Sequence, residues 1–379
     1  MTRHLQLRSA ARSLRRTPLL AVPLTAALLL SSCGTSGSDD GTDPSSESAS
    51  SSTDTSADSD TASTGVDTAL FLDGALTEEP TVEDCTLSGG TETTCYRITV
   101  SGYPVDHETG PFCPDSITDS AEEGGIWLDG ENVYDLDGAF FENLAETYDD
   151  DGWLMYDENG DIYVTETQEE FEAAARPDVD PDLANHCVEG SLEWLENGEP
   201  ITTEVLIPTT PVAAESAQTS QGNNGITLDG VVIAASAPVE AILSAYTIAA
   251  FDDCGGHYNP FEGYHMHGAT GCSEVGEAED GDTAMFGYAM DGYAVHSPFE
   301  EGEEPDDLDE CNGHTTETAG YHYHANPAAE NQVIECLVGQ TSASAEGGDG
   351  GGPPDGGGPP DGAAPPNGAP PAGAAPPEQ

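Results

Sequence analysis

The first half of the chain contains short apolar runs that are separated by turn-forming residues. The runs fall at residues 96–100, 126–128, 153–156 and 162–164, and Gly, Asp and Asn lie between them. Such runs predict short β-strands. Residues 167–175 form one longer segment that ends before Arg176-Pro177, and this segment predicts a helix.

A second part of the chain follows Pro208, Pro211 and the polar stretch 216–224. Residues 226–233 predict β structure centred on a turn, and residues 286–298 predict a hairpin around Asp291-Gly292. Residues 239–250 are apolar at mixed spacing, which leaves helix and strand both open. The pattern therefore predicts a mainly β body (α+β minor) with one or two short helices.

The two ends of the chain differ from this body. Residues 1–32 have a basic start and an apolar core that is too short to span a bilayer, as in a signal peptide. Leu30-Ser-Ser-Cys33 has the form of a lipobox, so we expect a lipid on Cys33, although a buried or disulfide-bonded cysteine is the alternative. The general and twin-arginine export routes both remain open. The expected location is the outer face of a bacterial cell membrane.

Composition divides the rest of the chain into four parts. Residues 33–66 are rich in Ser, Thr and Asp, and residues 341–379 are rich in Gly and Pro, so we expect a disordered tether and a disordered tail. The body between them is expected to consist of an N-terminal β-rich region, 67–212, and a second region, 213–340.

Charge excludes several partners. The chain has no lysine, and only Arg97 and Arg176 follow the signal, against 72 acidic residues, for a formal charge of about −70. Such a chain repels nucleic acid and anionic lipid, so the membrane is contacted through the anchor alone. The acidity indicates either solubility outside the cell or accumulation of cations. The sequence identifies no protein partner.

Eight cysteines remain besides Cys33, and an even number in an exported chain predicts four disulfides. We expect the pairs Cys254–Cys272 and Cys311–Cys336, because these are short loops. The other four would then pair with one another in the N-terminal region: Cys85, Cys95, Cys113 and Cys187.

The histidines occur in a repeated motif. Asp253-Cys-Gly-Gly-His257 precedes Gly263-Tyr-His-Met-His267, and Glu310-Cys-Asn-Gly-His314 precedes Gly320-Tyr-His-Tyr-His324. Eight positions agree at one offset, which indicates an internal duplication of residues 252–272 and 309–336.

The spacing predicts metal ligation. In a strand, residues i and i+2 share a face, so each His-x-His pair presents two imidazoles, and a turn brings the third one near. Imidazole is a ligand for copper and zinc. The predicted ligands are His257, His265, His267, His314, His322 and His324, with His296 as a further ligand or a structural histidine. The acids expected to orient the imidazoles are Asp252, Asp253, Asp309 and Glu310.

Other interpretations of these residues stay open. The histidines form one shared site or two, and they alternatively brace turns or act as acid–base groups without a metal. No catalytic residue can be identified. Residues 149–152 and 157–161 are acidic enough to suggest calcium, but neither has EF-hand spacing.

The second copy, from Leu308-Asp-Glu-Cys-Asn-Gly-His314 to Gly320-Tyr-His-Tyr-His324, resembles the YHYH domain family. The first copy and the segment Gly287-Tyr-Ala-Met-Asp-Gly-Tyr293 do so as well. The resemblance implies an exported, mainly β protein and no particular activity. The chain departs from the family at Met266, where a tyrosine is expected, and at His296, where an aromatic residue is expected. We therefore expect a lipoprotein that binds copper or zinc; the alternatives are a metal-dependent extracellular oxidase or hydrolase, and a structural or adhesive wall protein.

Overall fold

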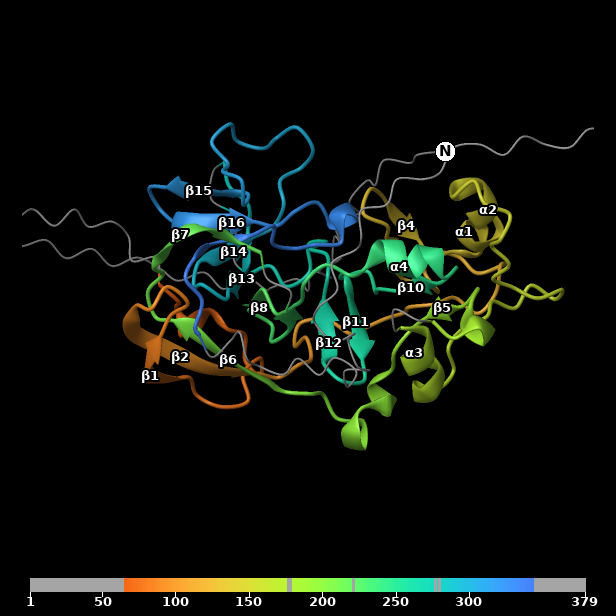
Figure 1. The fold of residues 1–379 in the computed structure, drawn as a ribbon, viewed down its shortest axis with the longest axis horizontal. Coiled ribbons are helices and arrows are strands. Elements are labelled where there is room, and N and C mark those ends of the chain that lie inside the picture. The colour runs from red at the N-terminus through yellow and green to blue at the C-terminus, as the bar shows by residue number, and fades with distance from the viewer. Residues whose placement is uncertain (1–64, 176–178, 220–221, 276–277, 279–280, 344–379) are drawn as a thin grey trace, which may run out of the picture. The chain divides into compact units, whose positions relative to one another are not determined.

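The computed structural model describes residues 65–175, 179–219, 222–275, 278 and 281–343, which belong to one compact unit (Figure 1). The expected signal peptide, the anchor Cys33 and nearly all of the expected tether and tail lie outside these residues. Within the described ranges, no helix combines the length and the apolar character needed to cross a membrane.

An eight-stranded sheet carries both histidine motifs (Figure 1). The strands follow in the order β11 (Gly256–Asn259), β12 (Gly263–Met266), β9 (Val232–Ile233), β8 (Gly225–Thr227), β13 (Met285–Ala289), β14 (Ala294–His296), β16 (Gly320–His324) and β15 (Gly313–Thr316). The hairpins predicted around Asp229-Gly230 and Asp291-Gly292 are present as β8–β9 and β13–β14. The prediction of a mainly β fold is confirmed.

The sheet consists of two equivalent halves of four strands each. In both halves the outer hairpin is antiparallel, its second strand runs parallel to the next strand, and an antiparallel strand follows at the centre. Across the centre Ile226 pairs with Tyr288. On either side of this pair, Gly225 pairs with Ala289 and Thr227 pairs with Gly287. The halves are therefore related by a local two-fold axis between Ile226 and Tyr288. The duplication extends well beyond the repeated Cys/His motif.

A smaller three-stranded sheet packs its apolar residues into the same core. It consists of β1 (Thr81–Thr86), β2 (Glu92–Val100) and β6 (Thr203–Pro208), all antiparallel. Ile98, Val205 and Ile207 from these strands share one buried cluster with Ile226 and Phe286 of the large sheet. This one core therefore contains residues from both regions that composition separates, 67–212 and 213–340.

A second cluster surrounds the short helices α1 (Gly138–Glu142), α2 (Leu144–Thr147) and α4 (Val239–Ser244). It includes β3 (Ile126–Leu128) and its partner β4 (Val133–Asp135), and also β5 (Cys187–Val188) with its parallel partner β10 (Ile248–Ala249). The predicted helix is α3 (Gln168–Ala174), whose first turn is capped by Thr167. Short 3₁₀ helices lie at Thr68–Leu70, Pro181–Leu183, Leu192–Trp194, Glu196–Gly198 and Ala328–Glu330.

Three expectations about local structure differ from what is observed. Residues 153–156 and 162–164 form only isolated β-bridges and no strands. Their apolar residues Trp153, Met155 and Ile162 pack in the second cluster, around the short helices. Residues 239–250 contain both a helix and a strand, α4 and β10.

The third difference concerns the start of the expected tail. Its first residues are hydrogen-bonded: Ser88 N–H donates to Thr341 O, and Ala343 N–H donates to Thr86 O. Just before them, β17 (Leu337–Gly339) pairs with β7 (Ala213–Gln218). The ordered body therefore extends at least to Ala343.

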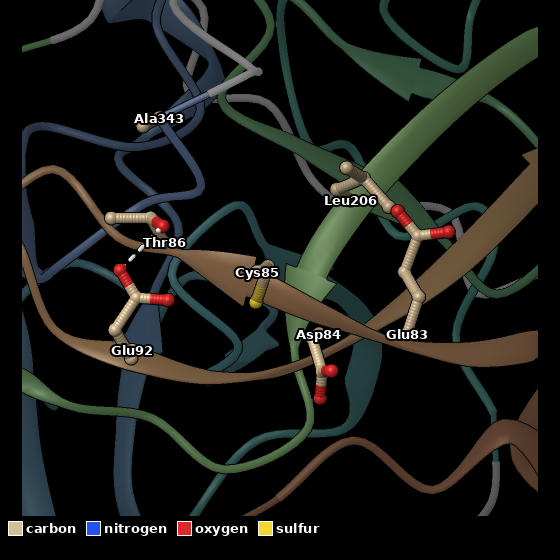
Figure 2. Close-up of a pocket in the computed structure, with 7 residues that line it drawn as sticks. All are labelled: Glu83, Asp84, Cys85, Thr86, Glu92, Leu206 and Ala343. Atoms are coloured by element: carbon tan, nitrogen blue, oxygen red, sulfur yellow. Dashed lines mark hydrogen bonds between the residues drawn. The ribbon is translucent and has the colours of Figure 1, made fainter.

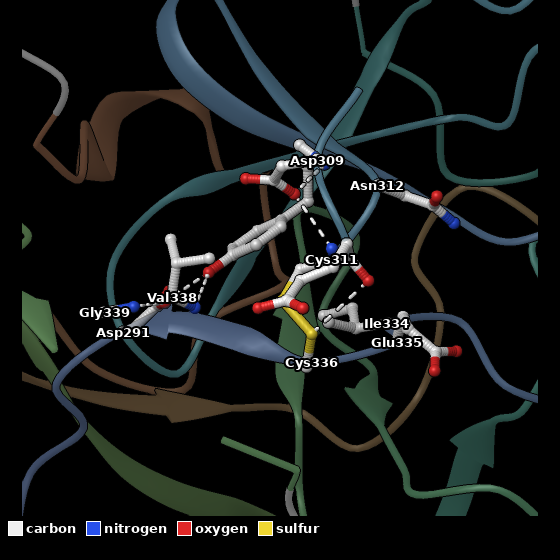
Figure 3. The surroundings of a disulfide bond; sticks show 12 residues. Asp291, Asp309, Cys311, Asn312, Ile334, Glu335, Cys336, Val338 and Gly339 are labelled. Atoms are coloured by element: carbon white, nitrogen blue, oxygen red, sulfur yellow. Dashed lines mark hydrogen bonds between the residues drawn. A yellow bond between two sulfur atoms is a disulfide. The ribbon is translucent and has the colours of Figure 1, made fainter. Parts of the chain in front are cut away.

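The predicted disulfides are present. Cys254 bonds to Cys272 and Cys311 bonds to Cys336. The remaining four pair as Cys85–Cys95 and Cys113–Cys187, within the N-terminal region as expected. Cys311 and Cys336 join the start of the second histidine hairpin to the segment that precedes β17 (Figure 3).

Candidate metal centres

One carboxylate holds the start of each histidine hairpin in place. Asp252 Oδ1 accepts the N–H groups of Cys254 and Gly256, and its Oδ2 accepts the Tyr264 hydroxyl at 2.7 Å. Asp309 makes the same three bonds in the second hairpin, with Tyr321 at 2.8 Å. The Asp309 bond to Cys311 N–H is visible beside the disulfide in Figure 3. These aspartates therefore orient the turn and the tyrosine, and none of the hydrogen bonds that they make with described residues goes to an imidazole.

The second hairpin brings three imidazole nitrogens together. His314 lies directly opposite His322 across β15–β16, and their Nε2 atoms are 3.1 Å apart. His324 Nε2 lies 3.2 Å from His314 Nε2. With metal–nitrogen bonds of about 2.0–2.1 Å, a tetrahedral zinc centre places two nitrogens about 3.3 Å apart. The observed spacing is close to this value.

The second ring nitrogen of each of these histidines faces an acceptor. His314 Nδ1 lies 3.3 Å from Asp307 Oδ1, and His322 Nδ1 lies 3.1 Å from the Gly320 carbonyl. His324 Nδ1 lies 3.3 Å from the Ser297 carbonyl. To donate to these oxygens, Nδ1 must carry the hydrogen of the neutral ring, which leaves a lone pair on Nε2. Three lone pairs therefore converge without a donor among them.

Asp282 completes this group, and the sequence analysis missed it. Its carboxylate oxygens lie 3.3 Å from His322 Nε2 and 3.5 Å from His324 Nε2. The group Asp282, His314, His322 and His324 thus offers four potential ligand atoms within 4.8 Å of one another. We name it the second-half site. It has the ligand number of a closed tetrahedral centre.

His296 lies beside this site and outside the four-residue group. Its ring stacks on His322 with centroids 4.3 Å apart. Its Nδ1 lies 2.7 Å from the Thr283 carbonyl and 3.3 Å from Asp282 Oδ1. In this position His296 holds Asp282 and the segment of Thr283 against the imidazoles.

Electrostatics keep the imidazoles of His322 and His324 neutral. Burial lowers the pKa of His322, and burial together with the neighbouring His322 lowers the pKa of His324 to about 3. Burial acts to raise the pKa of Asp282, but the Thr283 N–H and three imidazoles outweigh it, so that pKa lies below its usual range. At neutral pH the site therefore combines the neutral rings of His322 and His324 with one carboxylate, and imidazole and carboxylate are donors that a divalent cation prefers.

The first hairpin forms a separate group of His257, His265 and His267, which we name the first-half site. His257 faces His265 across β11–β12 with their Nε2 atoms 3.1 Å apart, and His265 Nδ1 faces the Gly263 carbonyl at 3.1 Å. Burial, followed by the neighbouring imidazoles, holds the pKa of His257 and of His267 well below the usual range. No carboxylate of the described residues belongs to this group.

The first-half site opens into a cavity of about 290 Å³. All three imidazoles line it, and so do residues of α3, α4 and the segment after β9. On the other side Phe251 packs against the rings of His257 and His267, with centroids 4.8 and 5.3 Å apart. The two sites thus share a histidine arrangement, and the first-half site lies against a cavity.

Two further groups of potential ligands involve His107. One joins it to Cys254 and Cys272, whose sulfurs are engaged in a disulfide, and the other joins it to Asp106 and Asp229. A larger hollow of about 470 Å³ lies on β1, β2 and β6 (Figure 2), where Glu83, Asp84 and Glu92 surround Cys85. No metal-binding group found among the described residues includes these three carboxylates.

The remaining acids named from the sequence have other places. Asp253 and Glu310 are exposed and belong to no potential metal group of the described residues. In the two acidic segments that suggested calcium, Asp150 accepts Gly152 N–H and the Tyr246 hydroxyl, and Asp157 accepts the N–H groups of Asn159 and Asp161. Among the described residues, these segments contribute to no potential metal group either.

Comparison with known families adds one finding. Residues 204–307 match the family model described as YHYH protein. The chain carries a YHYH domain. The matched segment contains the whole first-half site and Asp282, and it ends before the second histidine hairpin. No curated protein and no solved structure matches the chain.

Proposed function

We propose that this chain is an exported, lipid-anchored protein that binds two transition-metal ions, copper or zinc, one in each half of its eight-stranded sheet. The observation that carries the proposal is the second-half site. Three Nε2 lone pairs and the Asp282 carboxylate converge there, and the other ring nitrogens are committed to acceptors. Without a cation such a group of acceptors repels itself.

The alternative in which the histidines only brace turns has less support. The turns are already held by Asp252 and Asp309 with the tyrosine hydroxyls, and by the two disulfides. A metal-dependent extracellular oxidase or hydrolase has one observation in its favour, the cavity at the first-half site. A ligand set of three histidines beside a cavity is also the arrangement of catalytic zinc.

Metal content tests the proposal. The full chain, purified without a metal-affinity column, should contain two equivalents of copper or zinc by mass spectrometry. His265→Ala/His267→Ala and His322→Ala/His324→Ala should each remove one equivalent, while His186→Ala, which lies outside both sites, should remove none. At a metal concentration 100 times Kd, binding should stabilise the fold by about 2.7 kcal/mol per site. If the purified protein contains no metal, and its melting temperature does not change when copper or zinc is added, the proposal is wrong.

A further inference from the structure

The two halves differ at one equivalent position beside the imidazoles. When Asp229-Gly230 is aligned with Asp291-Gly292, Ala234 falls on His296. In the second half the His296 ring stacks on His322 and contacts Asp282. In the first half Ala234 lines the cavity instead. The cavity therefore lies beside the position that an imidazole fills in the other half.

Much of the rest of the cavity wall is apolar, although Asn223, Ser236, Thr247, Asn259 and Glu262 also line it. Phe171, Ala174, Val188, Ala241 and Ile242 contribute to it, from α3, β5 and α4. An apolar cavity of about 150 Å³ is known to hold benzene, so about 290 Å³ accommodates a six-membered ring with one additional polar group. The three imidazoles place the metal at one side of this space.

Charge indicates what the polar group is. In the second half, the carboxylates of Asp282 and Asp307 would together balance the charge of a divalent cation held by the imidazoles. In the first half, Glu262 lines the cavity without belonging to the ligand group, so one positive charge of a bound divalent cation would remain uncompensated. Burying an uncompensated charge is costly, and a monoanionic oxygen ligand removes that cost.

We propose that the first-half site binds a small monocarboxylate with an apolar body. Its carboxylate ligates the metal in the role that Asp282 has in the second half, and its body occupies the cavity between α3 and α4. The inference rests on the proposed metal binding. The strong negative charge of the whole chain opposes the approach of any anion, but this repulsion is screened over about 8 Å at physiological ionic strength. Affinity should therefore increase with added salt.

Benzoate is a suitable probe, and Co²⁺ is a suitable reporter because its visible spectrum changes with its ligands. The full chain carrying His322→Ala/His324→Ala retains the first-half site alone and should bind one Co²⁺. Benzoate should then shift the cobalt bands with saturation at one equivalent per chain. Benzylamine, which has the same ring and the opposite charge, should leave the bands unchanged. The metal-free protein should not bind benzoate.

Two substitutions from different elements test whether the ligand occupies the cavity. Ala234→Leu and Ala241→Phe should each weaken benzoate binding at least tenfold while Co²⁺ still binds at one equivalent. If cobalt binds and benzoate never shifts its bands, or if the shift survives both substitutions, the inference is wrong and the metal function stands. If the first-half site takes up no cobalt, the proposed function fails at that site and the inference fails with it.

Discussion

Asp282 Oδ2 lies 3.3 Å from His322 Nε2, although the two residues belong to different segments of the second half. The carboxylate supplies the only negative charge within that ligand group, so it should contribute strongly to affinity. We predict that Asp282→Asn weakens metal binding at the second-half site by 10- to 100-fold, an effect of the size seen for groups around metal ligands. Competition with a chromophoric chelator measures this.

The matched control for this substitution is Glu310→Gln, which changes an exposed acid next to the same hairpin. This substitution should leave the metal affinity of the first-half site and of the second-half site unchanged. The first-half site should also keep its affinity in the Asp282→Asn variant. Equal losses at both sites would contradict the assignment of Asp282.

Gly313 should not tolerate a side chain. A Cβ at this position would lie 2.0 Å from the Tyr321 hydroxyl oxygen, which is bonded to Asp309. We predict that Gly313→Ala lowers the free energy of unfolding by about 2 kcal/mol, as expected for a steric clash in a packed region. Urea unfolding measures the change. Gly222→Ala is the control, since a Cβ there meets nothing within 4 Å, and an equal loss in both variants would rule out the clash.

The two equivalent tyrosines should differ in their importance. Tyr264 and Asp252 are both about 1% exposed, whereas Asp309 is exposed and Tyr321 is half-buried. Removing the hydroxyl leaves a carboxylate short of one donor, which costs about 1–3 kcal/mol where water cannot replace it. Tyr264→Phe should therefore destabilise the protein by that amount, and Tyr321→Phe by clearly less. The order of the two denaturation midpoints checks this, and the reverse order would contradict it.

Asp229 should give the protein a specific dependence on pH. Burial raises its pKa to about 6, although the hydroxyls of Ser273 and Thr227 act in the opposite direction. The usual value for an unfolded chain is about 3.9. Between these values the unfolded chain releases its proton before the folded protein does, so the free energy of unfolding falls as pH rises from about 4 to 6.

Asp229→Asn removes this titration. The free energy of unfolding of this variant minus that of the unmodified protein should increase by about 2 kcal/mol as pH rises from 4 to 7. Chemical denaturation at the two pH values measures the difference. Asp73→Asn, at an exposed position, should show no such change. A difference that is constant with pH would mean that the pKa of Asp229 is the same in the folded and the unfolded protein.

Much of the site could be predicted from the sequence because it depends on local geometry. Residues such as His322 and His324 share a strand face by their spacing alone, and a short turn brings His314 opposite. The pairs Cys254–Cys272 and Cys311–Cys336 followed from loop length, whereas the pairing among the other four cysteines did not. The predicted mainly β body and the helix after Thr167 rest on equally local signals.

The rest depends on how distant segments return to the sheet. Asp282 is one carboxylate among many in an acidic stretch, and nothing in its spacing marks it as a ligand. Asp252 and Asp309 were expected to orient imidazoles, but backbone N–H groups of their own turns reach them first. The wider duplication could have been found by aligning Asp229-Gly230 with Asp291-Gly292. It was obscured because the surrounding side chains differ.

The contact between Ile226 and Tyr288 at the centre of the sheet has a consequence for how the protein handles metal. The halves meet through these central strands, while the two ligand sets belong to the outer hairpins. We expect each half to load and release its ion on its own, so that four occupancy states coexist in a population of chains.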